Sequence, residues 1–258
     1  YTFQELAALP IAQRREVLLS VGYPRRSLGM LEHALRSDLN QNAPRAMAVL
    51  KPLKVVIENL PEDHKEMLKA PFHPELDLGE REMPFTREIF IDQDDFKEEY
   101  SKKFKKKFCP GKRIRLRFSY VIEATDYEKD ADGNVTLVKA KLIENTLGEN
   151  PEDGVNPKGV VHWVSATDHK EAELRLYERL FTSATPDKGE GDFMDHVNKD
   201  SLSVVTALIE PALAEVDAEA NFQFEREGYY VADRFDHTAE KPIFNLTIGL
   251  REDKALLG

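Results

Sequence analysis

The residues between Lys102 and Arg117 are the ones whose types best suit binding chemistry. Nine lysines and arginines fall in this stretch with no acidic residue among them, although the whole chain has a formal charge of -11. Guanidinium and ammonium groups at close spacing bind phosphates and the edges of bases. We therefore expect this segment to bind a polyanion, and we favour RNA over a solvated face whose arginines are paired with acids.

Two elements are expected to position these charges. The spacing of four between Phe96, Tyr100, Phe104 and Phe108 predicts a helix. The following run "KRIRLRFSYVIEA" alternates apolar residues with arginines, which predicts a strand with one arginine face. On such a strand Arg113, Arg115 and Arg117 would form a row with about 7 Å between neighbours.

The rest of the chain reads as mainly β, preceded by a short helical segment. Leucines at spacings of three and four predict helix up to about Asn40–Pro44, and then the hydrophobic period changes to two. Several short strands with polar turns predict barrels or a sandwich. The turn from Asp130 to Asn134 predicts a hairpin rather than a calcium loop, because the third acidic ligand and the closing glutamate are missing.

Single residues outside the basic segment give weaker signals. His162 and Trp163 lie in an apolar strand, where we expect a core or interface role rather than catalysis. Acidic pairs such as Asp94 and Asp95 are expected to be ordinary surface charge. No phosphate-binding glycine loop, nucleophile elbow or metal-ligand set is found, so we expect no catalytic residue and no metal site in this chain.

Composition bounds the class of protein. The 258 residues are 41% apolar and 32% charged, which is typical of a folded protein. The one cysteine, Cys109, excludes an internal disulfide and any zinc site built from several cysteines. No apolar run is long enough for a membrane span. We expect a cytoplasmic protein that contacts neither DNA nor a membrane and works as a monomer.

Five segments, in order, closely resemble one family. They are "DLNQNAPRAMAVLKPLKVVIEN", "GVVHWVSA", "LRLYERLF", "NFQFEREGYYVADR" and "KPIFNLTIGLRE". Together they resemble the C-terminal half of the glutamine-tRNA ligase (glutaminyl-tRNA synthetase) family over residues 35–252. The resemblance implies two β-barrels, one inserted in the other, that bind the anticodon loop of a glutamine-specific tRNA.

The resemblance also implies the residues that read the anticodon. The family's arginine in "NAPRAMAV" falls on Arg45, its two arginines in "VRLR" fall on Arg115 and Arg117, and its glutamine and arginine in "FQFER" fall on Gln223 and Arg226. Where the family commonly has an arginine before a Pro-Gly turn, this chain has Lys107, a point charge without the bidentate fork. The neighbouring cations are expected to hold phosphates: Lys103, Lys105 and Lys106.

The domain boundaries expected from this resemblance are a helical connector over residues 1–42, a proximal barrel over 43–94 and 190–258, and a distal barrel over 95–189. The complete enzyme of the family would attach glutamine to tRNA using ATP with Mg. Its histidine-rich nucleotide-binding signature and lysine-containing loop do not occur in these 258 residues. We therefore expect this chain to bind no cofactor and to be inactive alone.

Three other readings stay open. One is a stand-alone RNA-binding paralogue without ligase activity, which the length of the natural reading frame upstream of Tyr1 would test. Another is the equivalent region of a glutamate-tRNA ligase, which charging assays would test. The last is a ribosomal-RNA-binding barrel, which would sediment with ribosomes.

Overall fold

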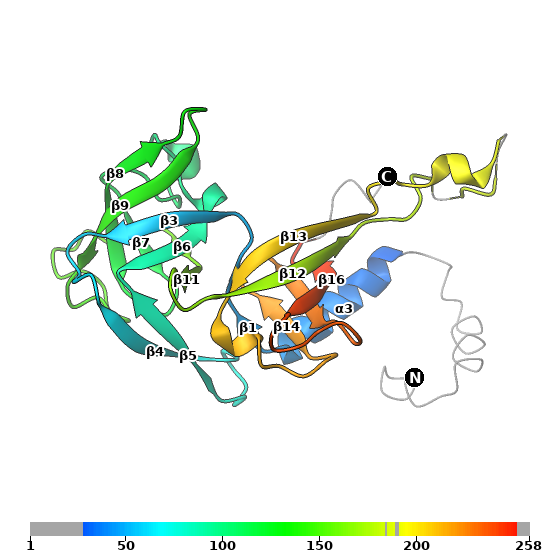
Figure 1. Ribbon diagram of the computed structural model, residues 1–258, viewed down its shortest axis with the longest axis horizontal. Coiled ribbons are helices and arrows are strands. Elements are labelled where there is room, and N and C mark those ends of the chain that lie inside the picture. Colours follow the sequence, from blue (N-terminus) through cyan, green and yellow to red (C-terminus); the bar gives the residue numbers. More distant parts are fainter. Residues whose placement is uncertain (1–27, 184, 189–190, 252–258) are drawn as a thin grey trace.

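The computed structural model describes residues 28–183, 185–188 and 191–251. The mainly β fold and the helix before it are confirmed, because a single described α-helix precedes two seven-stranded sheets (Figure 1). The part of the expected helical segment before residue 28 lies outside the described residues. The described α-helix has 15 residues and is not apolar enough to cross a membrane.

Helix α3 (Leu28–Asn42) leads into the first sheet and covers part of it. Its Leu35 and Leu39 pack with Tyr229 and Ile248 in a small core cluster. The helix ends two residues before Pro44, as expected because proline disfavours helical backbone in the residue before it. The predicted end of the helix is therefore confirmed.

The first sheet has the strand order β1-β14-β15-β16-β12-β13-β2. Its two edge strands, β1 and β2, follow each other in the chain with only Met47 between them, so the sheet is nearly closed into a barrel. Its strands are β1 (Arg45–Ala46), β2 (Ala48–Val49), β12 (Lys170–Tyr177), β13 (Leu202–Ile209), β14 (Asn221–Phe224), β15 (Gly228–Ala232) and β16 (Ile243–Gly249).

The second sheet has the order β10-β7-β8-β9-β3-β6-β11 and closes in the same way, with only His162 between its edge strands β10 and β11. Its strands are β3 (Pro52–Ile57), β6 (Glu88–Asp92), β7 (Arg113–Leu116), β8 (Val121–Lys129), β9 (Val135–Ile143), β10 (Val160–Val161) and β11 (Trp163–Ser165). All seven strands lie between β2 and β12 in the chain, so this barrel is inserted in the first one.

A separate two-stranded ribbon and four short 3-10 helices complete the described elements. The ribbon strands are β4 (Lys65–Pro71) and β5 (Glu80–Thr86), and the helices are η1 (Gln93–Asp95), η2 (Lys102–Phe104), η3 (Phe193–His196) and η4 (Pro211–Leu213). Alternating burial places Leu53, Val55 and Ile57 of β3 in the core of the second sheet. The first sheet has its own core, which includes Phe224 and Phe244.

Strand pairing differs from the expected domain boundaries at three strands. β3 and β6 fall within 43–94, yet they pair with β9 and β11 of the second sheet. β12 falls within 95–189, yet it pairs with β13 and β16 of the first sheet. The pairings β3–β9 and β12–β16 are parallel and join strands far apart in the sequence, where hydrophobic periodicity gives no information about the partner.

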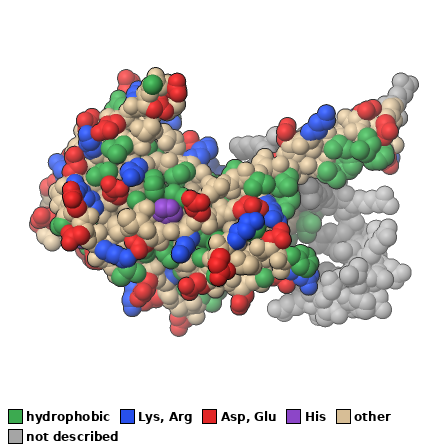
Figure 2. All heavy atoms as spheres, in the orientation of Figure 1, with side chains coloured by type: hydrophobic (Ala, Val, Ile, Leu, Met, Phe, Trp, Pro, Cys, Tyr) green, Lys and Arg blue, Asp and Glu red, His purple; other side chains and the backbone are tan. Residues whose placement is uncertain are grey.

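The hairpin of β12 and β13 projects beyond the first barrel (Figure 1). Leu174, Ala207 and Ile209 are fully buried in the barrel core at its base. Side chains nearer its far end are exposed, among them Tyr177 and Val204, and Figure 2 shows hydrophobic side chains at the surface of this projection. The hairpin is therefore anchored at its base, and Tyr177 Oη also donates a hydrogen bond to Asn245 Oδ1 of β16 at 3.1 Å.

The helix predicted from the aromatic spacing of four is wrong. Between Phe96 and Phe108 the chain forms only η2, because Phe96 and Phe108 are buried and bridge to each other, whereas Tyr100 and Phe104 are 49% and 41% exposed. The four rings therefore do not share one buried face. Backbone bonds Lys97 N to Phe108 O and Phe108 N to Asp95 O hold the two ends of the segment together.

The single strand predicted for "KRIRLRFSYVIEA" is also wrong, because it is a hairpin of β7 and β8. β7 ends at Leu116, and Phe118 has a positive φ of 55°, which turns the chain toward Val121. Arg117 therefore lies in the turn rather than on the strand. The hairpin predicted around Asp130–Asn134 is confirmed, as β8 and β9 pair antiparallel across it.

Candidate nucleic-acid interface

Arg45 and Gln223 are brought together by strand register. Arg45 on β1 pairs with Gln223 on β14 in a parallel ladder, so the two side chains stand on the same face of the sheet. None of the described residues accepts a hydrogen bond from the Arg45 guanidinium, whose Nε is buried. The two Nη atoms, which are neither buried nor bonded within the described residues, are thus available to a ligand.

Gln223 is 9% exposed and belongs to a polar relay under α3. Its Nε2 donates to Tyr229 Oη at 3.4 Å, and that hydroxyl donates to Asn40 Oδ1 at 3.3 Å. No described residue donates to Gln223 Oε1. Burial raises the pKa of Tyr229, with Arg45 and Arg36 opposing the rise, so the hydroxyl stays protonated near neutral pH and the relay keeps its direction.

Arg226 meets a buried carboxylate of the second barrel. Its Nη1 and Nη2 donate to both oxygens of Asp95, with 2.7 Å from Nη2 to Oδ1, and Lys107 Nζ lies 3.0 Å from the same Oδ1. Burial alone would raise the pKa of Asp95, but hydrogen bonds from Arg226 and Lys107 outweigh it and hold that pKa below its usual value. Two of the predicted residues therefore share one anion.

Arg117 lies beside the same loop that carries Arg226. Its Nε is 2.7 Å from Glu225 Oε2, and its guanidinium stacks 4.5 Å from the ring centre of Phe118. The side chain is 37% exposed. Arg117 therefore presents part of its guanidinium to solvent at the junction of the two barrels.

The predicted arginine row is broken by different partners. Arg113 pairs with Glu123 and Asp153 and its side chain is only 13% exposed, so it is neutralised by acids. Arg115 donates to the backbone oxygens of Ser119, Thr146 and Glu149, so it holds the loop after β9. These two arginines are engaged by the protein itself, unlike Arg45.

The lysines of the basic segment remain in solvent. Lys103, Lys105 and Lys106 are exposed, and none of them has an ion pair among the described residues. Lys107 instead is partly buried against Asp95. The exposed lysines therefore give the positive field predicted from the sequence.

Gly159 supports this lysine segment through a close backbone contact. A Cβ at position 159 would lie 2.1 Å from Lys106 O and 2.9 Å from Ile114 Cδ1. We expect Gly159→Ala to lower the free energy of unfolding by about 1 to 3 kcal/mol and to displace the lysine segment. Urea unfolding would measure this loss of stability. Gly249→Ala is the control, because the nearest atom to a Cβ at position 249 is 3.9 Å away; equal stability of the two variants would contradict the contact.

Three acidic residues of this region were missed or misjudged from the sequence. The prediction that Asp95 is surface charge is wrong: it is 2% exposed, whereas the neighbouring Asp94 pairs with Lys51 in solvent. Glu225 is 7% exposed and faces Arg117. Asp92, at 6%, accepts backbone N–H groups from Lys51 and Asp94. Glu225 alone had a sequence signal, since it lies inside the "FQFER" motif.

Asp92, His162 and Glu227 place potential ligand atoms within 4.8 Å of one another. Their hydrogen bonds do not suit a metal ion. Arg226 Nη1 lies 3.1 Å from His162 Nδ1, and because arginine can only donate, Nδ1 is the acceptor and Nε2 carries the proton. Nε2, 3.6 Å from Glu227 Oε1, is therefore a donor rather than a ligand.

Glu227 gives this cluster a pH dependence. Burial and then the Asp92 carboxylate raise its pKa to about 7, above the ordinary 4.5. The folded state therefore binds more protons than the unfolded state between these values, and the contribution of Glu227 to stability falls as the pH rises through this range. We expect Glu227→Gln to raise the free energy of unfolding at pH 8 by an amount on the order of 1 to 3 kcal/mol, with a much smaller gain at pH 5.

Urea unfolding at pH 5 and pH 8 would measure this effect. Glu240→Gln is a suitable control because Glu240 is exposed. An equal change for Glu227→Gln at both pH values would contradict the assignment.

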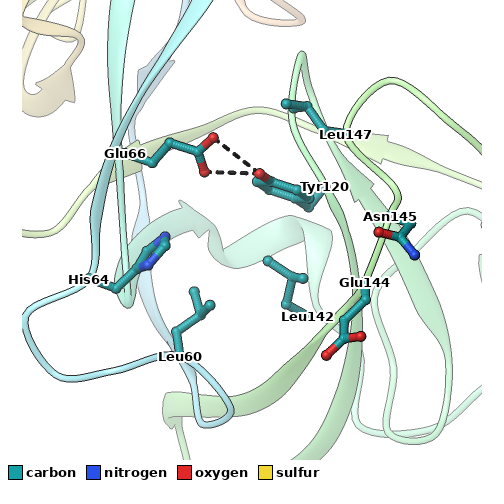
Figure 3. Close-up of a pocket in the computed structure, with 8 residues that line it drawn as sticks. All are labelled: Leu60, His64, Glu66, Tyr120, Leu142, Glu144, Asn145 and Leu147. Atoms are coloured by element: carbon teal, nitrogen blue, oxygen red, sulfur yellow. Dashed lines mark hydrogen bonds between the residues drawn. The ribbon is translucent and has the colours of Figure 1, made fainter.

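A cavity of about 460 Å³ lies elsewhere on the second barrel (Figure 3). It is lined by Leu60, His64, Glu66, Tyr120, Leu142, Glu144, Asn145 and Leu147. Tyr120 Oη donates to Glu66, and burial followed by this carboxylate raises the pKa of Tyr120 to about 12. With two glutamates and no lysine or arginine in its lining, the cavity does not suit a phosphate and contains none of the predicted site residues.

Comparison with known proteins identifies the class of this region. Residues 43–143 and residues 160–233 each match the family described as tRNA synthetases class I (E and Q), anti-codon binding domain. The chain belongs to this family of anticodon-binding domains. The two matched segments include nearly all strands of both sheets.

The similar curated proteins carry a more specific name. A glutamine-tRNA ligase of Ectopseudomonas mendocina (strain ymp) is 54% identical over 228 residues, which is 87% of this chain and 41% of that protein. The glutamine-tRNA ligases of Vibrio parahaemolyticus and Ralstonia nicotianae are 52% and 49% identical over 86% and 87% of this chain. The chain thus spans about two fifths of the length of these relatives.

Proposed function

We propose that this chain binds the anticodon loop of a tRNA. The observation that carries the proposal is the convergence of predicted residues from both barrels on β14 and the loop after it. Arg45 pairs in register with Gln223, Arg117 reaches Glu225, and Arg226 lies in the same loop. Planar donors suit the exposed base edges of single-stranded RNA.

The proposed roles follow the protein contacts of each side chain. Arg45, Gln223, Arg117 and Arg226 would read bases, because each keeps donors or acceptors that the described residues do not use. Lys107, tied to Asp95, would add charge near a base without a fork. Arg115 donates to carbonyl groups of the loop after β9, and we propose that it contacts RNA next to that loop. The exposed Lys103, Lys105 and Lys106 would contact phosphates.

We also propose that the tRNA is glutamine-specific and that the chain is part of a glutamine-tRNA ligase. The names of the relatives support this reading over the stand-alone and glutamate alternatives. The complete enzyme would use ATP with Mg to join glutamine to the tRNA, whereas this chain alone would be inactive. It would act in the cytoplasm as a monomer and bind neither DNA nor a membrane.

For the domain organisation, we propose a division by sheet rather than by the boundaries expected from the sequence. The inserted distal barrel would contain residues 52–165. The proximal barrel would contain residues 43–50 and 170–249, with α3 as the connector. Separate hydrophobic clusters for the two sheets support this division.

The proposal is tested by titrating a fluorescent anticodon stem-loop of glutamine tRNA with the chain. The control RNA has the same stem and a loop of unrelated sequence. We expect tighter binding of the anticodon stem-loop. Equal affinity for both hairpins would contradict recognition of the loop bases.

The phosphate role of the lysines predicts a change in salt dependence. Each phosphate contact to single-stranded RNA contributes about 0.7 to the slope of log K against log salt. We expect the Lys103→Ala/Lys105→Ala/Lys106→Ala variant to lose about 2 units of slope and to keep its preference between loops. Lys139→Ala is the control, because Lys139 already pairs with Glu128; an unchanged slope in the triple variant would remove the phosphate role.

A further inference from the structure

Arg226 is held by three hydrogen bonds to residues of the second barrel. Nη1 and Nη2 each donate a hydrogen bond to one Asp95 oxygen, and Nη1 also donates to His162 Nδ1 at 3.1 Å. Asp95 and His162 are 2% and 1% exposed. Because both acceptors are buried, the three hydrogen bonds fix the plane of the guanidinium.

His162 is suited to act as an acceptor. It occupies the one position between the edge strands β10 and β11, where the second barrel closes. Burial and then the Arg226 charge lower its pKa to about 4, so the ring is neutral near pH 7. The acceptor at Nδ1 is therefore present under ordinary conditions.

The bonds to the protein leave one edge of Arg226 unused. The guanidinium has five N–H groups, of which three point at Asp95 and His162. The remaining two, Nε–H and one N–H of Nη2, lie side by side on the other edge, and no described residue accepts from them. The side chain is 39% exposed, so this pair of parallel donors is open to a ligand.

The backbone of Arg226 adopts a strained conformation of the kind that is found at binding sites. Its φ is 72°, in the left-handed region that costs a non-glycine residue about 1 kcal/mol. Such conformations persist where the surroundings over-determine them and concentrate at binding sites. Here the surroundings are the short loop between β14 and β15 and the anchor at Asp95.

We infer that Asp95 and His162 are positioning residues that orient Arg226, so that its free edge donates two parallel hydrogen bonds to one base edge with neighbouring acceptor atoms. This inference rests on the proposed function and adds two specificity-determining residues to it. Neither residue touches the RNA. They act by removing the rotational freedom that a guanidinium on a long side chain would otherwise lose on binding.

The test uses Asp95→Asn, which keeps the size of the side chain and removes its charge and one acceptor oxygen. Dissociation constants of the 258-residue chain are measured for glutamine tRNA and for the same tRNA with a replaced anticodon. We expect the ratio of the two constants to fall at least about 10-fold. Asp94→Asn, on the same short helix but paired with Lys51 in solvent, is expected to leave the ratio within about 2-fold.

Two further variants, His162→Asn and His162→Leu, test the same inference if Asp95→Asn folds poorly. His162→Asn retains a side-chain oxygen near the position of Nδ1, whereas His162→Leu has no acceptor. We expect the asparagine to preserve discrimination and the leucine to reduce it. Thermal unfolding of both variants separates this effect from a general loss of stability.

Coupling to Arg226 distinguishes positioning from a merely structural role. In an Arg226→Ala/Lys107→Ala background, which also removes the second cation held by Asp95, we expect Asp95→Asn to leave the discrimination ratio unchanged. If it lowers the ratio there as well, or if neither Asp95→Asn nor His162→Leu changes the ratio in a parent chain that discriminates, the inference is overturned. A parent chain without any anticodon preference would instead overturn the proposed function itself.

Discussion

Replacing Arg45 with alanine is expected to weaken binding of glutamine tRNA roughly 10- to 100-fold, because a bidentate contact to a base is worth about 1 to 3 kcal/mol. Binding of a tRNA with a replaced anticodon should weaken much less. The Arg45 guanidinium has no hydrogen-bond acceptor among the described residues, so the substitution should leave the free energy of unfolding within about 0.5 kcal/mol. Anisotropy titrations with the two tRNAs would measure both losses.

Two controls separate geometry from charge at this position. Arg45→Lys keeps the positive charge but not the fork, so we expect it to lose most of the anticodon preference. Arg234→Ala removes an arginine that is 66% exposed and lies 3.6 Å from Glu219, and it should change neither affinity. If Arg45→Ala weakened the binding of both tRNAs equally, Arg45 would be a phosphate contact rather than a base contact.

The second large effect is a loss of stability, which is expected when the buried ion pair between Arg81 and Glu210 is broken. Their side chains are 0% and 3% exposed, and Glu210 Oε1 also accepts the backbone N–H of Met47 at 2.8 Å. Met47 is the residue between the edge strands of the first barrel, and its side chain packs in the core of the second. The pair therefore links the ribbon strand β5 to the place where the two barrels meet.

Glu210→Leu leaves the Arg81 charge buried and the Met47 N–H without its acceptor. We expect it to lower the free energy of unfolding by about 3 to 5 kcal/mol, the usual result of removing one partner of a buried pair. Urea unfolding would measure this loss beside Glu88→Ala, which breaks the exposed pair with Lys54 and should cost less than about 1 kcal/mol. Similar losses for the two variants would contradict the structural role of Glu210.

Much of the fold follows from local sequence patterns. The change of hydrophobic period after Asn42 predicts the mainly β barrels, and the turn at Asp130–Asn134 predicts the β8–β9 hairpin. The aromatic spacing of four wrongly predicted a helix, because Tyr100 and Phe104 are exposed and the four rings share no common core. The positive φ at Phe118 is set by how the chain turns between β7 and β8, which alternation of arginines does not reveal.

The candidate site was only partly predictable. The motifs around Arg45, Gln223 and Arg226 identify residues that the structure brings to one strand and its following loop. The acid that holds Arg226 could not be found in this way, since Asp95 is 131 positions from Arg226 and looks like any surface aspartate. Ion pairs across such distances depend on how the two barrels meet, and neither composition nor periodicity carries that information.

The central claim is that base edges of the anticodon, and not only phosphates, are recognised by this chain. The most direct measurement is its binding to glutamine tRNA and to the same tRNA with a replaced anticodon, over a series of salt concentrations. Phosphate contacts set the salt slope, whereas base contacts set the difference between the two tRNAs. We predict a preference for the native anticodon that persists as salt rises; equal and steeply salt-dependent binding of both tRNAs would contradict the account.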